Sequence, residues 1–304
     1  MEFFENLDLK RLENLELLAK QVVEGFIIGL HKSPFHGFSV EFAEHRLYNP
    51  GESTRNIDWK VYGRTDKMFI KRYEEETNLR CQIIIDTSSS MFFPEEKDKW
   101  NKLQFSAVAA ASLMNLLRKQ RDAFGLSLFD EVVHNHTKCK SSFSHYQLLL
   151  TYLNEVISDT KRSKKTSTAK ALHQLAETIH RRSLVVIFSD MFETQDSVED
   201  MFGALQHLKH AKHEVLLFHV NDKKYEFDFE FDNRPYEFED METGEKVKLQ
   251  SHQVKDFYKD KIESYYEEIK MKCLQYKIDL IQTDINEGFY PVLQNYLVKR
   301  KRMK

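Results

Sequence analysis

The chain has 304 residues, of which 41% are hydrophobic and 31% charged, and its net charge is −3 at pH 7. This composition excludes an intrinsically disordered chain, and the length suffices for one or two domains with a substantial core. The small net charge gives no overall attraction to nucleic acid or anionic membranes. Three distant cysteines without a CxxC pair exclude a disulfide framework and favour a reducing compartment. The N-terminus has no signal-peptide pattern, so we expect a cytoplasmic protein.

Residues 1–78 are expected to form an N-terminal helix and a small β region. Leucines recur among charged residues from residue 8 to residue 30, a pattern typical of an amphipathic helix. Short strand-like runs follow at 38–42 and 68–73, with a Pro-Gly turn signal between them.

From residue 79 to residue 304, predicted strands and helices alternate. The strands are expected at 80–86, 123–129, 131–137, 184–188, 214–220 and 277–282, and the helices at 99–121, 144–157, 168–181, 196–211, 253–275 and 288–300. Because such alternation builds parallel sheets covered by helices, we predict an α/β domain with a doubly wound, mostly parallel sheet. A hairpin insertion is expected near 221–250, with its turn at 242–245.

The first predicted strand of this domain ends in a cluster of oxygen-bearing side chains. The buried apolar run Ile83–Ile85 stops at Asp86, and Ser88 and Ser90 complete a D-x-S-x-S pattern. Ligands of open α/β sheets bind outside the carboxyl ends of the strands, where this loop lies. Carboxylate and hydroxyl oxygens are hard ligands that suit Mg2+ or Ca2+. We therefore predict a metal site here.

Two further connections supply oxygens for the same edge of the sheet. Asp190 follows the predicted strand 184–188, and Thr166 precedes the helix predicted from residue 168. Two carboxylates would offset the charge of one divalent cation, which would still attract an incoming carboxylate or phosphate. Taken singly, a Ser or Thr before a helix is an ordinary N-cap, and an acid at a strand end is common. The predicted metal ligands are Asp86, Ser88, Ser90, Thr166 and Asp190.

These residues resemble the metal-ion-dependent adhesion site of von Willebrand factor type A domains. The wider pattern is similar to one bacterial branch, the domain-of-unknown-function family 58. Three motifs carry this similarity: R-x-Y-x-P-G-E-x-x-R-x-I-D-W at 46–59, K-x-Y-E-E-E at 71–76 and F-E-D-x-E-T-G at 238–244. The chain departs from the pattern at Lys164 and Lys165, which stand where two glycines usually precede the threonine. Two cations there would weaken a bound metal electrostatically.

The resemblance implies a von Willebrand factor type A-like fold and a non-enzymatic, protein-binding role. Such proteins are typically encoded beside MoxR-type AAA+ ATPases and are thought to act with them as a chaperone-like pair. A partner's Asp or Glu would complete the coordination of Mg2+, or of Mn2+ or Ca2+. The ATPase would be a separate chain, because this sequence contains no G-x-x-x-x-G-K-[ST] motif.

Two other classes of function compete with this interpretation. A metal-dependent hydrolase could use the same Asp, Ser and Thr side chains, since a bound divalent ion can activate water. The sequence, however, shows no positioned general base and no G-x-S-x-G motif, and His134 and His136 lack the further ligands of a zinc set. Nucleic-acid binding would use the basic clusters 161–165 and 299–302, but neither contains aromatic residues. We therefore assign no catalytic residue and expect no nucleic acid.

Overall fold

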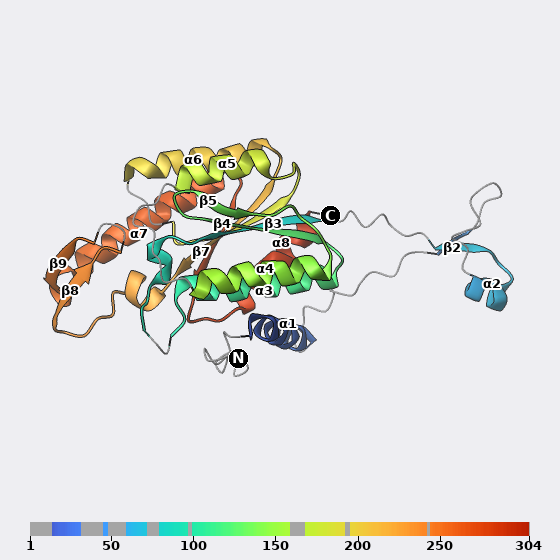
Figure 1. Cartoon of the computed structure of the whole chain (residues 1–304), viewed down its shortest axis with the longest axis horizontal. Helices are drawn as coiled ribbons and strands as arrows, with labels where there is room; N and C mark the ends of the chain where they lie inside the picture. Colours follow the sequence, from blue (N-terminus) through green and yellow to red (C-terminus); the bar gives the residue numbers. More distant parts are fainter. Residues whose placement is uncertain are drawn as a thin grey trace. The chain divides into compact units, whose positions relative to one another are not determined.

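A computed structural model of the chain describes residues 14–31, 45–47, 59–71, 79–96, 99–158, 168–191, 195–241 and 244–303. The chain divides into two compact units (Figure 1). One unit combines the N-terminal segment up to Ile28 with everything from Leu79 onward, and the other is Gly29–Asn78. Helix α1 (Leu15–His31) therefore groups largely with the C-terminal α/β unit, whereas the sequence analysis placed it with the small β region.

The smaller unit contains three short elements among its described residues. These are β1 (His45–Leu47), α2 (Trp59–Thr65) and β2 (Phe69–Lys71), and β1 pairs with β2 in antiparallel orientation. Of the strand expected at 68–73, β2 lies within the described part, and residues 72–73 lie outside it. The strand expected at 38–42 also lies outside the described residues.

The larger unit is built on a six-stranded sheet. Its strands are β3 (Arg80–Asp86), β4 (Ala123–Phe129), β5 (Val133–His136), β6 (Leu184–Ser189), β7 (Glu214–Asn221) and β10 (Asp279–Asp284), in the order β10-β7-β6-β3-β4-β5. All neighbouring pairs are parallel except β4 and β5, which are antiparallel. The predicted mostly parallel sheet is confirmed.

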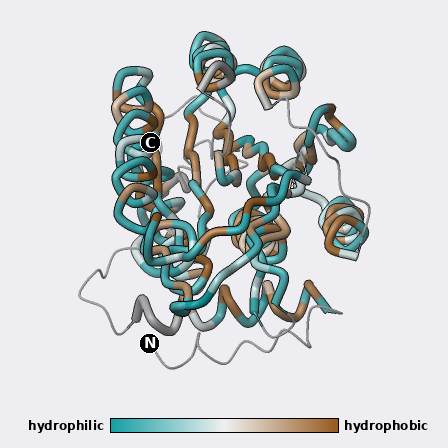
Figure 2. Tube along the Cα trace, turned by 90° about the vertical axis from the view of Figure 1, so that its left-hand side faces the viewer, coloured by the Kyte–Doolittle hydropathy of each residue, from teal (hydrophilic) through white to brown (hydrophobic). Residues whose placement is uncertain are grey.

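Helices cover both faces of this sheet (Figure 1). They are α3 (Lys102–Lys119), α4 (Phe143–Ser158), α5 (Thr168–Thr178), α6 (Gln195–His210), α7 (Ser251–Gln275) and α8 (Tyr290–Arg302). Helix α3 packs against α4 and α8 on one face, and α5 packs against α6 on the other. The helices seen nearly end-on in Figure 2 combine hydrophilic with hydrophobic residues, as expected for helices with one face against a sheet.

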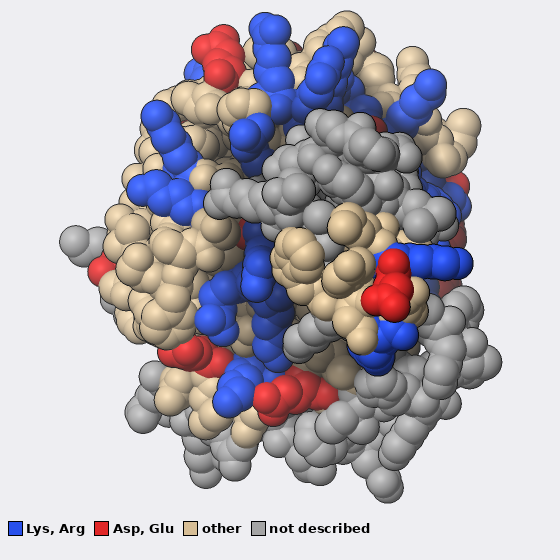
Figure 3. Space-filling model, turned by 90° about the vertical axis from the view of Figure 1, so that its right-hand side faces the viewer, with Lys and Arg blue, Asp and Glu red and all other residues tan. Residues whose placement is uncertain are grey.

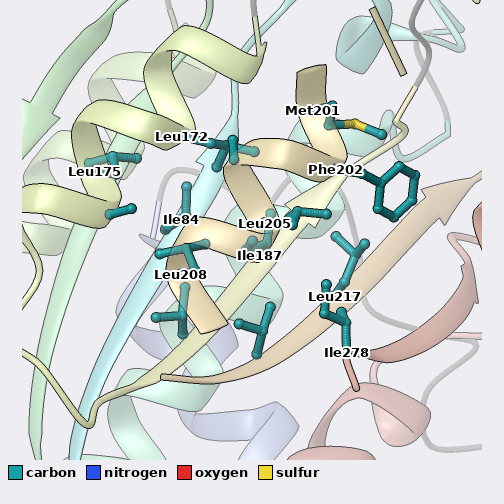
Figure 4. Packing of buried hydrophobic residues seen from close by; sticks show 14 of the residues in the cluster. Ile84, Leu172, Leu175, Ile187, Met201, Phe202, Leu205, Leu208, Leu217 and Ile278 are labelled. Carbon is teal, nitrogen blue, oxygen red and sulfur yellow. The ribbon is translucent and has the colours of Figure 1, made fainter. Parts of the chain in front are cut away.

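The central strands are buried because their side chains are apolar on both faces. In β3 only Arg80 is exposed. Ile84 and Ile187 of the sheet meet Leu172 of α5 and Leu205 of α6 in one buried cluster, to which α7 contributes Ile269 (Figure 4). Burial on both faces is typical of parallel strands between two helical layers.

Local hydrogen bonds and turns set the element boundaries. Helix α3 begins at Lys102 rather than near residue 99, because Asn101 and Gln104 form a capping box. The Asn101 side chain accepts from the Gln104 N–H at 2.7 Å, and the Gln104 side chain accepts from the Asn101 N–H at 3.2 Å. Strand β10 begins two residues later than predicted, because Lys277 occupies the left-handed region (φ 56°) in the turn after α7.

The insertion after β7 contains a π-helical turn and a hairpin. The turn η4 spans Lys223–Phe227, and β8 (Pro235–Glu239) pairs with β9 (Lys246–Gln250) in antiparallel orientation, as the sequence predicts. Over the described part of the chain, no helix combines the length and the apolar character needed to cross a bilayer.

Candidate functional site

The predicted site lies where the strand order of the sheet reverses. From β3 the chain continues to β4 on one side, and β6 later adds on the other side. In open α/β sheets, ligands bind beyond the carboxyl ends of the strands at such a point. Asp86 ends β3 and Asp190 directly follows β6. Since Ile85 pairs with Phe188, the register places Asp86 beside Ser189.

Asp86 is buried, and hydrogen bonds hold both of its carboxylate oxygens. Its Oδ1 accepts from the Ser88 N–H at 3.0 Å, and its Oδ2 accepts from the Ser189 hydroxyl at 2.7 Å. The hydroxyl oxygens of Ser88 and Ser90 lie 3.1 Å apart, at the start of the short 3-10 turn η3 (Ser89–Phe92). The loop after β3 therefore brings one carboxylate and two hydroxyls together.

The second carboxylate of the site, Asp190, is buried against a lysine. The Lys102 ammonium lies 2.7 Å from Asp190 Oδ2, and both side chains are almost completely buried. The Ser189 hydroxyl that donates to Asp86 also accepts from the Met191 N–H at 3.0 Å. The Tyr265 hydroxyl of α7 donates to the Met191 carbonyl, so the chain on either side of Asp190 is fixed.

Lys102 also contacts a third carboxylate, from the turn after β7. Its Nζ lies 2.6 Å from Glu226 Oε1. Strands β7, β6 and β3 are neighbours, so Glu226, Asp190 and Asp86 all come from the carboxyl ends of adjacent strands. Neither Lys102 nor Glu226 is among the site residues predicted from the sequence. One signal could have found Lys102: a cation in the first turn of a helix opposes the helix dipole and therefore calls for a compensating anion.

The buried charges shift the pKa values of these groups. Burial, together with the neighbouring Asp190, raises the pKa of Asp86 to about 7, against the hydrogen bonds from Ser88 and Ser189. Burial alone would lower the pKa of Lys102, but Asp190 and Glu226 outweigh it and hold the ammonium charged. Burial also raises the pKa of Glu226, and it lowers that of His219 to about 4.

The donor chemistry fits a divalent cation. Asp86, Asp190, Ser88 and Ser90 offer only carboxylate and hydroxyl oxygens, which suit Mg2+. The cluster contains three carboxyl groups and one ammonium, which contacts Asp190 and Glu226, and His219 adds no positive charge at neutral pH because burial lowers its pKa to about 4. The excess negative charge would be reduced by a bound cation.

Thr166 is not among the described residues, and neither are Lys164 and Lys165, so their placement stays a prediction. Within the described ranges, no group of three or more His, Cys, Asp or Glu side chains is arranged to hold a metal. The predicted set differs from such groups because half of its described members are serine hydroxyls.

The histidines of β5 are hydrogen-bonded separately. His134 lies 2.7 Å from Asp130, whereas His136 lies 3.0 Å from the Ser127 hydroxyl. These separate partners do not form a shared zinc site.

Two residues of the C-terminal basic cluster, Lys299 and Arg300, are paired with acids of the same unit. Lys299 pairs with Glu214 and Asp279, each at 2.7 Å, and Arg300 pairs with Asp122 at 2.6 Å. Lys and Arg side chains are spread over the face shown in Figure 3 with Asp and Glu among them. Lys299 and Arg300 are therefore poor candidates for phosphate contacts.

The family model described as "Protein of unknown function DUF58" matches residues 44–267, more than half of the chain. The chain belongs to the DUF58 family. This confirms the family expected from the sequence motifs. The DUF58 chain is also 25% identical over 213 residues to the uncharacterized protein Rv1480 of Mycobacterium tuberculosis, covering 70% of this chain and 65% of that protein. It thus spans less than two thirds of the length of this relative.

Solved structures similar to this DUF58 chain include a conserved hypothetical protein BatB from Bacteroides thetaiotaomicron. That structure is 11% identical, with a TM-score of 0.43, over 72% of this chain and 99% of the other. The VWA domain of SpRpn10 is 10% identical, with a TM-score of 0.37, over 72% of this chain and 95% of the other. Because these scores are low, the doubly wound α/β architecture rests on the strand order and helical layers of the chain itself.

Proposed function

We propose that this DUF58 protein is a non-enzymatic protein-binding domain that holds a divalent cation, most simply Mg2+, at the carboxyl edge of its sheet. A role in protein interaction agrees with its fold and family. The metal is supported by two acids, Asp86 and Asp190, at the ends of neighbouring strands where the strand order reverses, and by the two serine hydroxyls in the loop after Asp86. Mg2+ commonly takes only one or two protein carboxylates and leaves positions for other oxygens.

In this proposal, Ser88 and Ser90 would hold the ion together with Asp86 and Asp190, and Thr166 would add a third hydroxyl. The bound ion would supply a positive centre that attracts an anion. Hydrogen bonds from Ser88 and Ser189 orient the Asp86 carboxylate, which reduces the reorganisation needed on binding. A partner's Asp or Glu would then complete the coordination. We propose a MoxR-type AAA+ ATPase as this partner, on the strength of the family resemblance.

Calorimetric titration with Mg2+ and Mn2+ tests the metal site. The wild type is expected to bind saturably, and the Asp86→Ala variant is expected to lose binding while keeping its fold. Asp130→Ala is the matched control, because Asp130 follows the neighbouring strand β4 at the same edge but pairs with His134. Equal binding by wild type and Asp86→Ala would contradict the proposed site.

Capture of the partner tests the function. The immobilised protein is expected to retain a MoxR-type ATPase encoded beside it when Mg2+ is present, and to release it in EDTA. Asp86→Ala should capture none, whereas Asp130→Ala should behave as wild type. Capture that is insensitive both to EDTA and to Asp86→Ala would exclude the metal-bridged mechanism.

A further inference from the structure

Lys102 is a fully buried cation within the proposed metal site. Its ammonium lies 2.7 Å from Asp190 Oδ2 and 2.6 Å from Glu226 Oε1, and the Lys102 side chain is 1% exposed. Removing charged groups from water is energetically costly, so a buried ion pair is often no more stable than well-packed apolar residues. Stability alone therefore gives little reason to place a lysine here.

The two carboxylates that contact Lys102 differ in their other roles. Asp190 is a proposed metal ligand. Glu226 is held independently of that set: its Oε2 accepts from the Asp222 N–H at 2.6 Å, and its backbone carbonyl accepts from the Tyr258 hydroxyl at 3.0 Å. A small shift of the ammonium toward Glu226 would leave the lysine buried and paired while Asp190 turns to another cation.

An ammonium and a divalent ion at the same carboxylate compete in two ways. Both need the lone pairs of Asp190, and their like charges repel each other strongly where water is excluded. The flexible stem of a lysine allows its charge to move by a rotamer change, which the fixed fork of an arginine would hinder.

We propose that the Lys102 ammonium competes with the divalent ion for Asp190; this inference rests on the proposed function. When the metal binds Asp190, Glu226 holds the ammonium. The Lys102–Glu226 pair thereby sets the metal affinity of the site. The metal-free site keeps Asp190 paired, and binding of the ion must displace this contact.

The decisive variant is Lys102→Met combined with Glu226→Gln, because it removes one charge of each sign and keeps the net charge. Titration with Mn2+ is expected to show at least about tenfold tighter binding than wild type, since Asp190 no longer has a competing ammonium. Glu226→Gln alone is expected to bind more weakly than wild type, because the ammonium then relies on Asp190. Lys99→Met, which removes a partly exposed lysine paired with Glu96, is the matched control and should leave the affinity unchanged.

Circular dichroism and thermal melting must show that each variant is folded before it is titrated. Weaker or unchanged binding by the folded double variant would overturn the inference; weaker binding would mean that Lys102 positions Asp190 for the metal instead.

If the double variant binds no more tightly than wild type while Asp86→Ala still abolishes binding, the inference fails and the proposed metal site stands. If no protein in the set binds Mn2+, both fail. If adding Asp86→Ala to the double variant leaves its Mn2+ binding intact, the ion binds elsewhere and both also fail.

Discussion

The Asp86 carboxyl group is buried, and its hydrogen bonds only partly stabilise its negative charge. Burial and the nearby Asp190 raise its pKa from 3.8 to about 7. A carboxyl group with a raised folded-state pKa binds its proton more tightly in the folded chain than in the unfolded one. Its contribution to stability is therefore complete below about pH 4 and is lost as the pH rises toward 7.

Because Asp86 ionises in the folded protein, we expect Asp86→Asn to raise the free energy of unfolding by an amount that grows with pH in metal-free buffer. The variant lacks the ionisation, so its free energy of unfolding relative to wild type should increase by roughly 2–3 kcal/mol between pH 5 and pH 8. Urea unfolding of both proteins in EDTA at the two pH values measures the difference. A difference that is the same at both values would show that Asp86 does not titrate in this range.

Sequence patterns reveal site residues that lie in one loop, and they miss those that meet only in the folded chain. Asp86, Ser88 and Ser90 follow one buried strand, so their proximity is local and could be predicted. The contact between Lys102 and Glu226 joins residues 124 positions apart, through a π-helical turn with no recognised sequence signal. They meet because β7, β6 and β3 are neighbours in the sheet, with Glu226 following β7 and Lys102 opening the helix that follows β3.

At the scale of elements, β4 packs closely against the Gln82 side chain and the Thr137 backbone at Gly125. A Cβ at Gly125 would lie 2.5 Å from Gln82 Oε1 and 2.6 Å from the Thr137 carbonyl oxygen. The backbone oxygen cannot move without disturbing the chain that flanks the edge of the sheet. This glycine is therefore required by the packing of β4.

Gly125→Ala is accordingly expected to destabilise the protein by about 1–3 kcal/mol, which is the usual cost of overpacking. Gly203→Ala in α6 is the matched control, because the nearest atom to its new Cβ is His173 Nε2 at 4.0 Å. That change should be neutral or stabilising by up to about 1 kcal/mol, since alanine favours helix. Equilibrium unfolding in urea compares the two, and equal effects would contradict the packing argument.

Strands could be predicted from the sequence where burial on both faces requires apolar residues. The strands β3, β4 and β6 consist largely of apolar residues buried on both faces, and their predicted positions agree with the structure within one residue. Element ends were harder to predict, because a capping box or a left-handed turn residue decides them. The edge strand β5 has only four residues and is partly exposed, so its pattern is weak.

At the scale of the whole molecule, α1, which precedes the sheet in the sequence, packs against α8 and α4 of the larger unit. Phe26 of α1 is completely buried, and its ring centroid lies 5.1 Å from that of Tyr290 in α8. Glu16 of α1 accepts a hydrogen bond from Gln147 of α4 at 2.8 Å. Apolar side chains of α1 are buried along its length, including Leu18 and Val22. The helix is therefore an integral part of the α/β core.

Cleavage within Gly29–Asn78 should consequently leave the two fragments associated. A specific protease site inserted after Asp66, in the exposed turn that follows α2, is expected to be cut without release of the α1 fragment. Size-exclusion chromatography of the cleaved protein provides the measurement. The same cleavage in a Phe26→Asp background should release the fragment, and release from the wild-type background would show that α1 is not held by its buried face.

The contact between Phe26 and Tyr290 also has a consequence for synthesis on the ribosome. Helix α1 emerges before α8, so a surface it needs is made only when α8 has been translated. Contacts between residues so distant in sequence form late, because closing a long loop costs entropy. The apolar face of α1 therefore stays exposed while the segment from α1 to α8 is translated, and in that interval the nascent chain offers a binding site to chaperones.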